Sequence, residues 1–256
     1  MMAQNTSTAV MQRRVEPHDS LDFFPTPPWA TRALCEHVLP GVWYSPRMTA
    51  WDPACGEGHM VRPLGEYFAR VIASDVHPYG FGAVEDFLFP HADRGADWII
   101  TNPPFRLAQQ FIDRGLAEAR GGVAVLVRTA FLEGIDRFER LFSAVPPAVV
   151  AQFVERVPMV KGRCDRAASS ATSYAWIVWR SNRDLRETRL IWIPPCRKRL
   201  ERDTDYRDFG AGLMPPGDAT LPDPAIQRES VKRCPAPEVT ASGFVSRMDG
   251  TPQPNS

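Results

Sequence analysis

The sequence predicts an open α/β fold in which helices cover a mostly parallel β-sheet. Residues 121–127 (GGVAVLV) form a continuous apolar run of the kind found at the centre of parallel sheets. Residues 97–101 (DWIIT) form a second short apolar strand, which two prolines end abruptly. Residues 49–69 read as a strand, a glycine-rich turn and a helix in succession, a unit from which such sheets are built.

Length and charge limit the possible partners. The 256 residues suffice for one large α/β domain with tails, and the hydrophobic fraction of 44% supports a sizeable core. Because 30 basic residues balance 30 acidic ones, there is no global basic field, and a nucleic-acid partner would need a local patch. Nearly all basic residues are arginines, which suit phosphate contacts, but a GC-rich genome produces the same bias.

The cysteines and the apolar runs indicate the cellular compartment in which the protein is expected. The five cysteines contain no C-x-x-C pair, so neither a disulfide framework nor a zinc site is predicted. The start of the chain lacks a signal-peptide pattern, and no run approaches the roughly 18 apolar residues of a membrane span. We therefore expect a reducing, cytoplasmic location without membrane contact.

The amino-terminal region contains a tail and a proline-rich turn. Residues 1–20 are polar and aperiodic and are expected to be disordered. Residues 22–29 (DFFPTPPW) form an extended turn that the prolines fix. Thr26 is predicted to cap a helix that has Pro27 and Pro28 in its first turn and runs to about Leu39.

A glycine-rich turn follows the strand at 49–52. It is formed by residues 53–59 (PACGEGH), and a helix is predicted after it, to about Ala69. Glycines let the backbone approach a ligand, and a helix start offers free N–H groups. Asp52, at the strand end, would repel a pyrophosphate and favours a ligand with an ammonium group. The alternative is a glycine turn that binds nothing.

Two further acidic positions suit a nucleotide-like cofactor. The strand at 70–75 ends in Asp75, roughly 20 residues after the glycine turn, where an acid typically accepts hydrogen bonds from ribose hydroxyls. Asp86 and Phe87 place a carboxylate beside a ring, a pair that can bind and pack against an adenine. Taken singly, these last two would be ordinary loop residues.

The catalytic hypothesis rests on residues 102–105 (NPPF), at the carboxyl end of the strand 97–101. Ligands of open α/β sheets bind beyond the carboxyl ends of the strands. An amide beside an aromatic ring on a stiff loop can hold a flat heteroaromatic amine. The alternative is a strand that simply ends in a proline turn.

The remaining chain is predicted to complete the sheet. Helices are expected at 107–119 and 131–142, and strands at 148–153, 174–179 and 189–193. The last two strands follow closely, so they are predicted to form an antiparallel hairpin.

Two polar segments flank that hairpin. Residues 157–173 are aperiodic and carry Lys161, Arg163 and Arg166, which makes them a possible substrate-recognition loop. Residues 199–256 lose apolar periodicity and are expected to be a mostly disordered tail.

Three motifs together resemble a known family. They are FPTP at 24–27, DPACGEG at 52–58 and NPPF at 102–105. In this order they resemble the S-adenosylmethionine-dependent DNA N6-adenine methyltransferases of gamma type, with compact phage and prophage members most alike. The resemblance covers roughly residues 20–195. It implies a catalytic domain at 21–198 with a doubly wound, Rossmann-like, seven-stranded class I methyltransferase fold that ends in an antiparallel hairpin.

The resemblance also implies a role for each matching residue. The methionine end of S-adenosylmethionine would be held by the backbone at Phe24, Pro25 and Thr26. The cofactor loop would be lined by Asp52, near the ammonium group, and by Ala54, Gly56 and Gly58. Asp75 would bind the ribose, and Asp86 and Phe87 the cofactor adenine. The catalytic loop would be Asn102, Pro103, Pro104 and Phe105.

The implied reaction needs neither a metal nor a general base. Oxygen acceptors of Asn102 and Pro103 would bind the N–H groups of the adenine amine, and Phe105 would stack on the target ring. In duplex DNA the target must first be flipped out. DNA phosphates would be contacted by Lys161, Arg163, Arg166 and Arg180, unless these residues form only a solvated charged face.

Several alternatives stay open at this point. Larger relatives carry a target-recognition region, whereas here only residues 157–173 and the carboxyl tail could serve, which argues against narrow sequence specificity or moves recognition to a partner. The same tetrapeptide occurs in enzymes that methylate adenine in RNA, the second choice, or glutamine amides in proteins. A catalytically silent cofactor-binding protein, such as a decoy that occupies DNA, and an α/β domain for another nucleotide complete the set. No oligomeric state is predicted.

Overall fold

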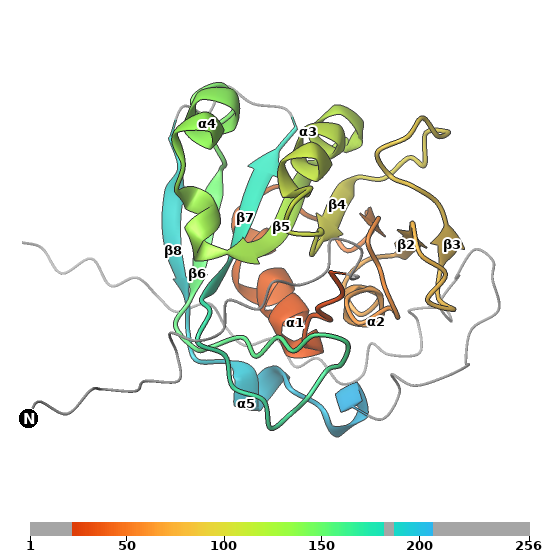
Figure 1. Ribbon diagram of the computed structural model, residues 1–256, viewed down its shortest axis with the longest axis vertical. Helices are drawn as coiled ribbons and strands as arrows, with labels where there is room; N and C mark the ends of the chain where they lie inside the picture. The colour runs from red at the N-terminus through yellow and green to blue at the C-terminus, as the bar shows by residue number, and fades with distance from the viewer. Residues whose placement is uncertain (1–21, 182–186, 207–256) are drawn as a thin grey trace, which may run out of the picture. The chain divides into compact units, whose positions relative to one another are not determined.

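Figure 1 shows the computed structural model of the chain, which describes residues 22–181 and 187–206. Eight strands in this part of the chain form one mixed sheet in the order β3-β2-β1-β4-β5-β7-β6-β8. Their bounds are β1 Thr49–Asp52, β2 Arg70–Asp75, β3 Ala83–Val84, β4 Trp98–Thr101, β5 Gly122–Arg128, β6 Val149–Phe153, β7 Tyr174–Arg180 and β8 Arg189–Ile193. The predicted mixed, doubly wound α/β sheet is confirmed, with eight strands in place of seven.

The antiparallel strand is positioned differently from the prediction. β7 lies between β5 and β6 and runs antiparallel to both. β8 does not pair with β7, because it lies beyond β6 and runs parallel to it. Burial explains the difference: β7 is buried on both faces and needs a neighbour at each edge, whereas β8 exposes Leu190 and Trp192 as an edge strand can.

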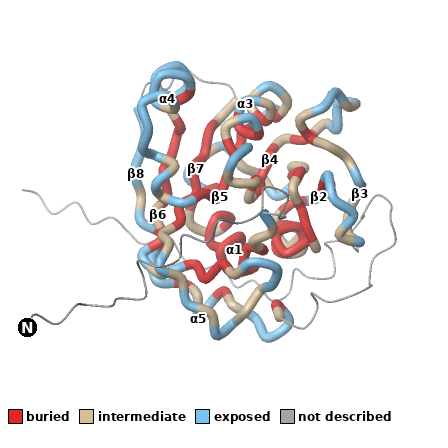
Figure 2. Tube along the Cα trace, in the orientation of Figure 1, coloured by how far each residue is buried: buried red, intermediate tan, exposed pale blue. Residues whose placement is uncertain are grey.

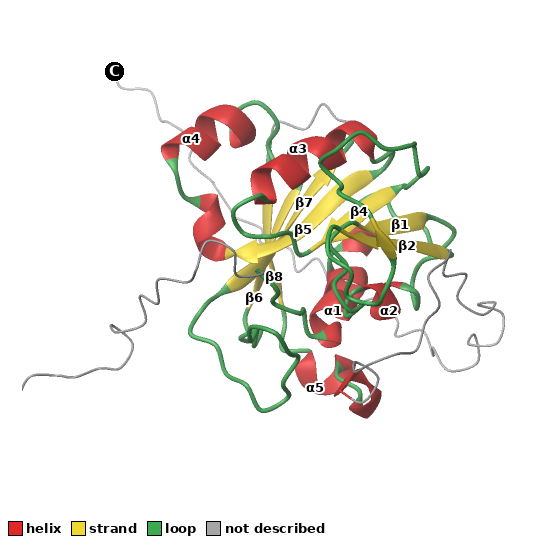
Figure 3. Ribbon diagram, turned by 45° about the vertical axis from the view of Figure 1, so that its right-hand side comes forward, coloured by secondary structure: helices red, strands yellow, loops and turns green. Residues whose placement is uncertain are grey.

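The sheet separates two hydrophobic cores. One core lies against α1 (Pro28–His37) and α2 (Val61–Leu64), and the other against α3 (Ala108–Glu118). Figure 3 shows α1 and α2 on one side of the twisted sheet and α3 on the other. The central strands are buried on both faces, as Figure 2 shows for β4 and β7. A parallel sheet covered in this way directs its strand ends, rather than its faces, to ligands.

Several helices differ from their predicted form. Thr26 does not cap α1, whose N-cap is Pro27, and the Thr26 hydroxyl forms no hydrogen bond with the start of the helix. The helix expected at 131–142 is broken into α4 (Ile135–Arg137) and the short turns Thr129–Leu132 and Phe138–Phe142. Gly134, at φ 124°, interrupts it. The helix after the glycine turn is limited to α2, which ends at Leu64 with Gly65 as its C-cap, and does not extend to Ala69 as predicted.

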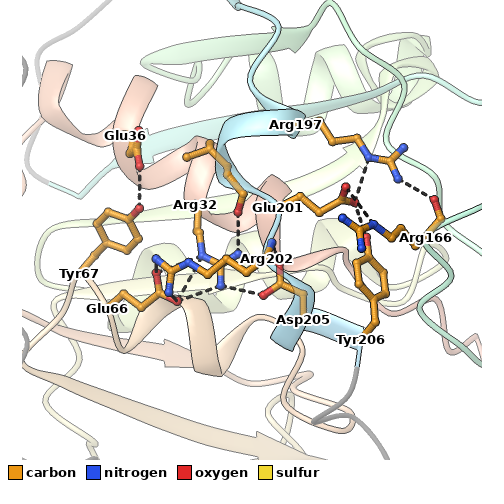
Figure 4. A network of polar contacts seen from close by, with 11 residues as sticks. Arg32, Glu36, Glu66, Tyr67, Arg166, Arg197, Glu201, Arg202, Asp205 and Tyr206 are labelled. Carbon is orange, nitrogen blue, oxygen red and sulfur yellow. Dashed lines mark hydrogen bonds and ion pairs between the residues drawn. The ribbon is translucent and has the colours of Figure 1, made fainter. Parts of the chain in front are cut away.

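The carboxyl-terminal part of the described chain folds against α1. It contains α5 (Arg197–Leu200) and a 3-10 turn at Asp203–Tyr206. Arg32 of α1 donates to the Leu200 carbonyl at 2.8 Å and forms two hydrogen bonds of 2.8 Å with the Asp205 carboxylate (Figure 4). The predicted tail at 1–20 lies outside the described residues. Of the predicted tail at 199–256, residues 199–206 belong to this folded segment, and residues 207–256 lie outside the described residues.

Three further observations concern membrane spans, metal ligands and cysteines. In the described ranges, no helix combines the length and apolarity needed to cross a bilayer. The same ranges contain no group of three or more His, Cys, Asp or Glu side chains placed to hold a metal ion. Four of the five cysteines lie in these ranges, and all four are free thiols.

Candidate active site

A cavity of about 420 Å³ lies at the carboxyl ends of β1, β2 and β4. Its walls are formed by the segment before α1, the glycine turn, the loops after β2 and β3, and the NPPF loop. The predicted site residues that line it are Phe24, Pro25, Thr26, Asp52, Ala54, Asp75, Asp86, Phe87, Asn102 and Pro104. Three motifs that are distant in sequence therefore share one cavity.

The predicted glycines do not line the cavity but shape the turn behind it. Gly56 and Gly58 have φ of 51° and 86°, in the left-handed region that favours glycine. A Cβ on Gly56 would lie 2.5 Å from the Phe23 ring, and one on Gly58 would lie 2.5 Å from the Phe81 ring. Both glycines are thus needed for aromatic rings to pack directly on the turn.

Asp52 is a buried carboxylate that lacks a cationic partner. Its exposed fraction is 1%, and no basic side chain of the described residues forms an ion pair with it. Burial raises the pKa of Asp52 to about 7, although the Thr101 hydroxyl and the Ala54 N–H favour the ionised form. A ligand cation at this position would supply the missing charge.

Asp75 lies beside the glycine turn and is partly satisfied by backbone groups. The Gly56 N–H donates to Asp75 Oδ2 and the His77 N–H donates to Oδ1, both at 2.9 Å. Burial raises the pKa of Asp75 despite these bonds. Because each carboxylate oxygen can accept two hydrogen bonds, the pair keeps acceptor capacity for a ligand's hydroxyl groups.

Asn102 presents a buried acceptor. Its Nδ2 donates to the Phe24 carbonyl at 2.8 Å, which fixes the orientation of the amide. Its Oδ1 is buried and accepts no hydrogen bond within the described chain. The Thr26 hydroxyl, in the same cavity, is also buried and unpartnered. Since buried polar groups are nearly always paired, these atoms indicate a ligand that pairs with them.

Asp86 and Phe87, from the loop after β3, also line the cavity. Asp86 Oδ1 accepts the Leu88 N–H at 2.9 Å, which fixes the carboxylate. Phe87 has an exposed fraction of only 1%, with its ring edge-to-face with Trp51 at 5.1 Å and tilted against Phe111. The ring is therefore an apolar wall as much as a stacking surface.

The segment before α1 holds together parts of the site that the sequence did not reveal as partners. Asp22 Oδ2 accepts the Phe105 N–H at 2.8 Å, and the Phe23 carbonyl accepts the Gly162 N–H at 2.9 Å. The Phe23 ring stacks on Tyr79 at 4.7 Å. Asp22 and Phe23 adjoin the predicted FPTP motif, which was the available signal, whereas Tyr79 had none because its role depends on tertiary contact.

Two more missed residues lie close to the catalytic loop. The Sδ atom of Met159, from the predicted recognition loop, is 3.9 Å from Asn102 Nδ2. His59 lines the cavity, and burial, with the nearby positive charge of Arg62, lowers its pKa to about 3. His59 is therefore neutral at physiological pH and adds no positive charge that would repel a cationic ligand.

Pro103 and Phe105 do not line the cofactor-sized cavity. Pro103 is buried within the loop. Phe105 is partly buried, and the Arg128 guanidinium lies over its ring, 4.1 Å from the centroid. Phe105 instead lines a second, smaller cavity next to the loop.

The four predicted phosphate-binding residues do not share one surface. Lys161, Arg163 and Arg166 lie on the 157–173 loop, where Arg163 pairs with Asp165 and Arg166 with Asp203. Arg180 ends β7 opposite Gly122, the first residue of β5. It therefore lies at the opposite end of β5 from the catalytic edge of the sheet.

Comparison with known proteins gives likeness of fold. No protein-family profile matches the sequence, and no curated protein matches it. A protein of Listeria monocytogenes, assigned as a class I S-adenosylmethionine-dependent methyltransferase, aligns with a TM-score of 0.50 and 14% identity over 69% of this chain and 69% of its own. That likeness shows that the chain has the Rossmann-like class I methyltransferase fold.

Two other solved structures are less similar in shape. A Pyrococcus horikoshii protein, assigned as an RNA methyltransferase, aligns with a TM-score of 0.49 and 14% identity over 71% of this chain and 100% of its own. A modification subunit from Vibrio vulnificus, assigned to a type I restriction enzyme, aligns with a TM-score of 0.46 and 17% identity over 78% of this chain and 53% of its own.

Proposed function

We propose that the protein transfers a methyl group from S-adenosylmethionine to the N6 amino group of adenine in DNA. The observation that supports this most strongly is the buried, unpartnered Oδ1 of Asn102. It lies at the carboxyl end of β4, in the wall of a cavity that also contains the unpaired carboxylate of Asp52. A hydrogen-bond acceptor for an amine and an anion for an ammonium group are thus combined in one site.

The unsatisfied groups fit this cofactor. The ammonium group of its methionine part would pair with Asp52, which explains a carboxylate that is buried without a counter-charge. Asp75 would accept hydrogen bonds from the ribose hydroxyls. Asp86 and Phe87 would bind the adenine ring, and the Thr26 hydroxyl would pair with the methionine end.

Asn102 would activate the target amine by electrostatics. The lone pair of an adenine amino group is delocalised into the ring, so acceptors on its two N–H bonds favour a tetrahedral nitrogen and stabilise the positive charge that develops. Asn102 Oδ1 and the Pro103 carbonyl would be these acceptors. The hydrogen bond from Asn102 Nδ2 to Phe24 and the stiffness of the prolines keep them fixed before the reaction.

The cofactor supplies a methyl group bonded to a sulfonium sulfur. The chain's own contribution is to align the amine with that group, since holding two reactants in line removes much of the entropic barrier. The backbone of Phe24 is well placed for this, because it contacts Asn102 and also lines the cofactor cavity.

Transfer of a labelled methyl group to nucleic acid, followed by nucleoside mass spectrometry, tests the proposal. The substrates are unmethylated single-stranded DNA, double-stranded DNA and RNA of the same sequence. We expect N6-methyladenine in DNA. Label in RNA alone would show that the substrate is RNA and not DNA. Label in the glutamine of a protein would show that the substrate is a protein and not a nucleic acid. Failure to bind S-adenosylmethionine would contradict the proposal altogether.

A further inference from the structure

A second cavity, of about 160 Å³, lies beside the catalytic loop. Its walls include Phe105 of that loop and Arg128 at the end of β5. Phe131 and Arg137, from the segment that follows β5, also line it. The buried residues Ala108 and Val127 make part of its lining apolar.

Each aromatic ring in this cavity is stacked with a guanidinium group. Arg128 lies 4.1 Å from the centroid of the Phe105 ring, and Arg137 lies 4.2 Å from that of Phe131. Arg137 also donates to the Phe131 carbonyl at 2.6 Å. Two contacts between a guanidinium group and an aromatic ring therefore line one small cavity.

Arg128 lies opposite Tyr174 of β7, its cross-strand partner. Burial raises the pKa of the Tyr174 hydroxyl, and the nearby Arg128 side chain opposes that rise, so the two side chains lie close together. The arginine is nevertheless exposed to solvent. It can thus stack within the cavity while its charge remains available to a phosphate at the rim.

These properties select the chemistry of a ligand. Aromatic rings and guanidinium planes are the surfaces on which unpaired nucleobases stack. A glutamine side chain has no ring to stack, and a cation would be repelled by the two arginines. A free phosphate would not use the apolar part of the lining. A flat, uncharged heterocycle attached to a phosphate backbone uses both the apolar lining and the charge of the arginines.

We infer that this cavity binds the nucleobase next to the methylated one in an opened or single-stranded nucleic acid. The inference rests on the proposed function. The methylated base itself does not occupy this cavity, because Asn102 and Pro104 line the cofactor cavity and not this one. Phe105 connects the two sites, because its ring lines the second cavity and is also tilted against Phe24 of the cofactor cavity, with the ring centroids 5.5 Å apart. The ring can therefore contact both the methylated base and its neighbour.

The test is a cycle that combines a change in the protein with a change in the ligand. The oligonucleotide carries one adenine within a run of thymines, and an abasic residue replaces the thymine on either side of it. Affinity is measured by fluorescence anisotropy in the presence of S-adenosylmethionine, with the intact chain. We expect one abasic position to weaken binding roughly tenfold, in line with the loss of one stacked base.

Two variants remove one stacking surface each. Phe131→Leu keeps apolar volume but removes the ring, and Arg128→Lys keeps the charge but removes the plane. Each is expected to weaken binding of the intact oligonucleotide by several-fold. Neither should weaken binding of the sensitive abasic oligonucleotide further, because the contact is already lost. Arg120→Ala, a control at an exposed arginine that precedes β5, should leave both affinities unchanged.

The outcomes separate this inference from the proposed function. If the abasic residue weakens binding to both variants as much as it weakens binding to the unaltered protein, the two losses of affinity are additive. That result would overturn the inference even if adenine is methylated. Coupled losses without methyl transfer to adenine would support the base-binding cavity and contradict the proposed reaction. Because the binding assay needs no turnover, the two results are independent.

Discussion

Two buried polar clusters in this protein differ in whether their polar groups have partners within the described chain. In the cofactor cavity, Asp52 has no counter-charge, and Asn102 Oδ1 has no donor within the described chain. Around Arg32, in contrast, the guanidinium donates to Glu66, to Asp205 and to a backbone carbonyl (Figure 4). Burial alone would lower the pKa of Arg32, but the hydrogen bonds with Asp205 and Glu66 raise it above its ordinary value.

The difference distinguishes binding from structure. A buried donor or acceptor without a partner costs about 1–3 kcal/mol, so several of them in one cavity indicate that a ligand completes them. A cluster whose partners all come from the chain has no such need. We therefore assign the Arg32 cluster to holding residues 197–206 against α1, and the cavity to ligand binding.

Breaking the paired cluster should have the largest effect, and on stability. Arg32→Met leaves Glu66 and Asp205 without their shared cation, and we expect the free energy of unfolding to fall by about 3–5 kcal/mol. Chemical denaturation measures it. Arg199→Met, at a more exposed arginine that pairs with Glu36, should cost only about 0–1 kcal/mol. Equal losses in the two variants would remove the contrast between buried and exposed pairs.

Neutralising Asp52 should affect ligand affinity instead. Asp52→Asn loses a charge-assisted contact, and we expect binding of S-adenosylmethionine to weaken by about 1.5–3 kcal/mol at pH 8. In the unaltered protein the dissociation constant should rise by up to about tenfold per unit as pH falls below 7, because the ligand then requires loss of a proton. Calorimetric titration between pH 6 and 8 measures both.

Stability without cofactor should respond to pH in the opposite direction. Burial raises the folded-state pKa of Asp52 above its unfolded value, so the folded protein holds the proton more tightly. This residue's contribution to stability therefore falls as pH rises from about 4 to about 7. Asp52→Asn should lack that component. If Asp52→Asn keeps the pH dependence of both cofactor affinity and stability, then a group other than Asp52 is the one that titrates.

The glycine turn should give the smallest effect. Gly56→Ala places a methyl group 2.5 Å from the Phe23 ring, on a backbone with φ of 51°. The left-handed conformation alone costs roughly 1–2 kcal/mol for a residue with a side chain. Because this strain is present with and without the cofactor, we expect the free energy of unfolding to fall by about that amount, measured by chemical denaturation. Gly80→Ala, also at positive φ but in open space, separates backbone strain from displacement of Phe23.

The sequence predicted the cavity better than the sheet around it. Asp52 and Asp75 end apolar strands and Asn102 directly follows one, so their convergence followed from the parallel arrangement of β1, β2 and β4. The insertion of β7 between β5 and β6 was missed, because a short connection suggests a hairpin whether or not another strand intervenes.

Long-range polar contacts were not predictable from local patterns. Arg32 lies in an ordinary amphipathic helix, and its partners Glu66 and Asp205 are 34 and 173 residues away. The bond from the Phe105 N–H to Asp22 likewise spans 83 residues. No periodicity or motif encodes such pairs, since they depend on where the folded chain brings the two groups.

The most direct test of the central claim is the effect of Asn102→Ala on cofactor affinity and on methyl transfer, measured on the same preparation. Removal of one preorganised acceptor should lower the single-turnover rate by about 10²–10³. The dissociation constant of S-adenosylmethionine should change little, because Asp52, Asp75 and the Phe24 segment remain. An equal loss of rate and affinity, or an unchanged rate, would contradict the assignment of Asn102 as the acceptor for the target amine.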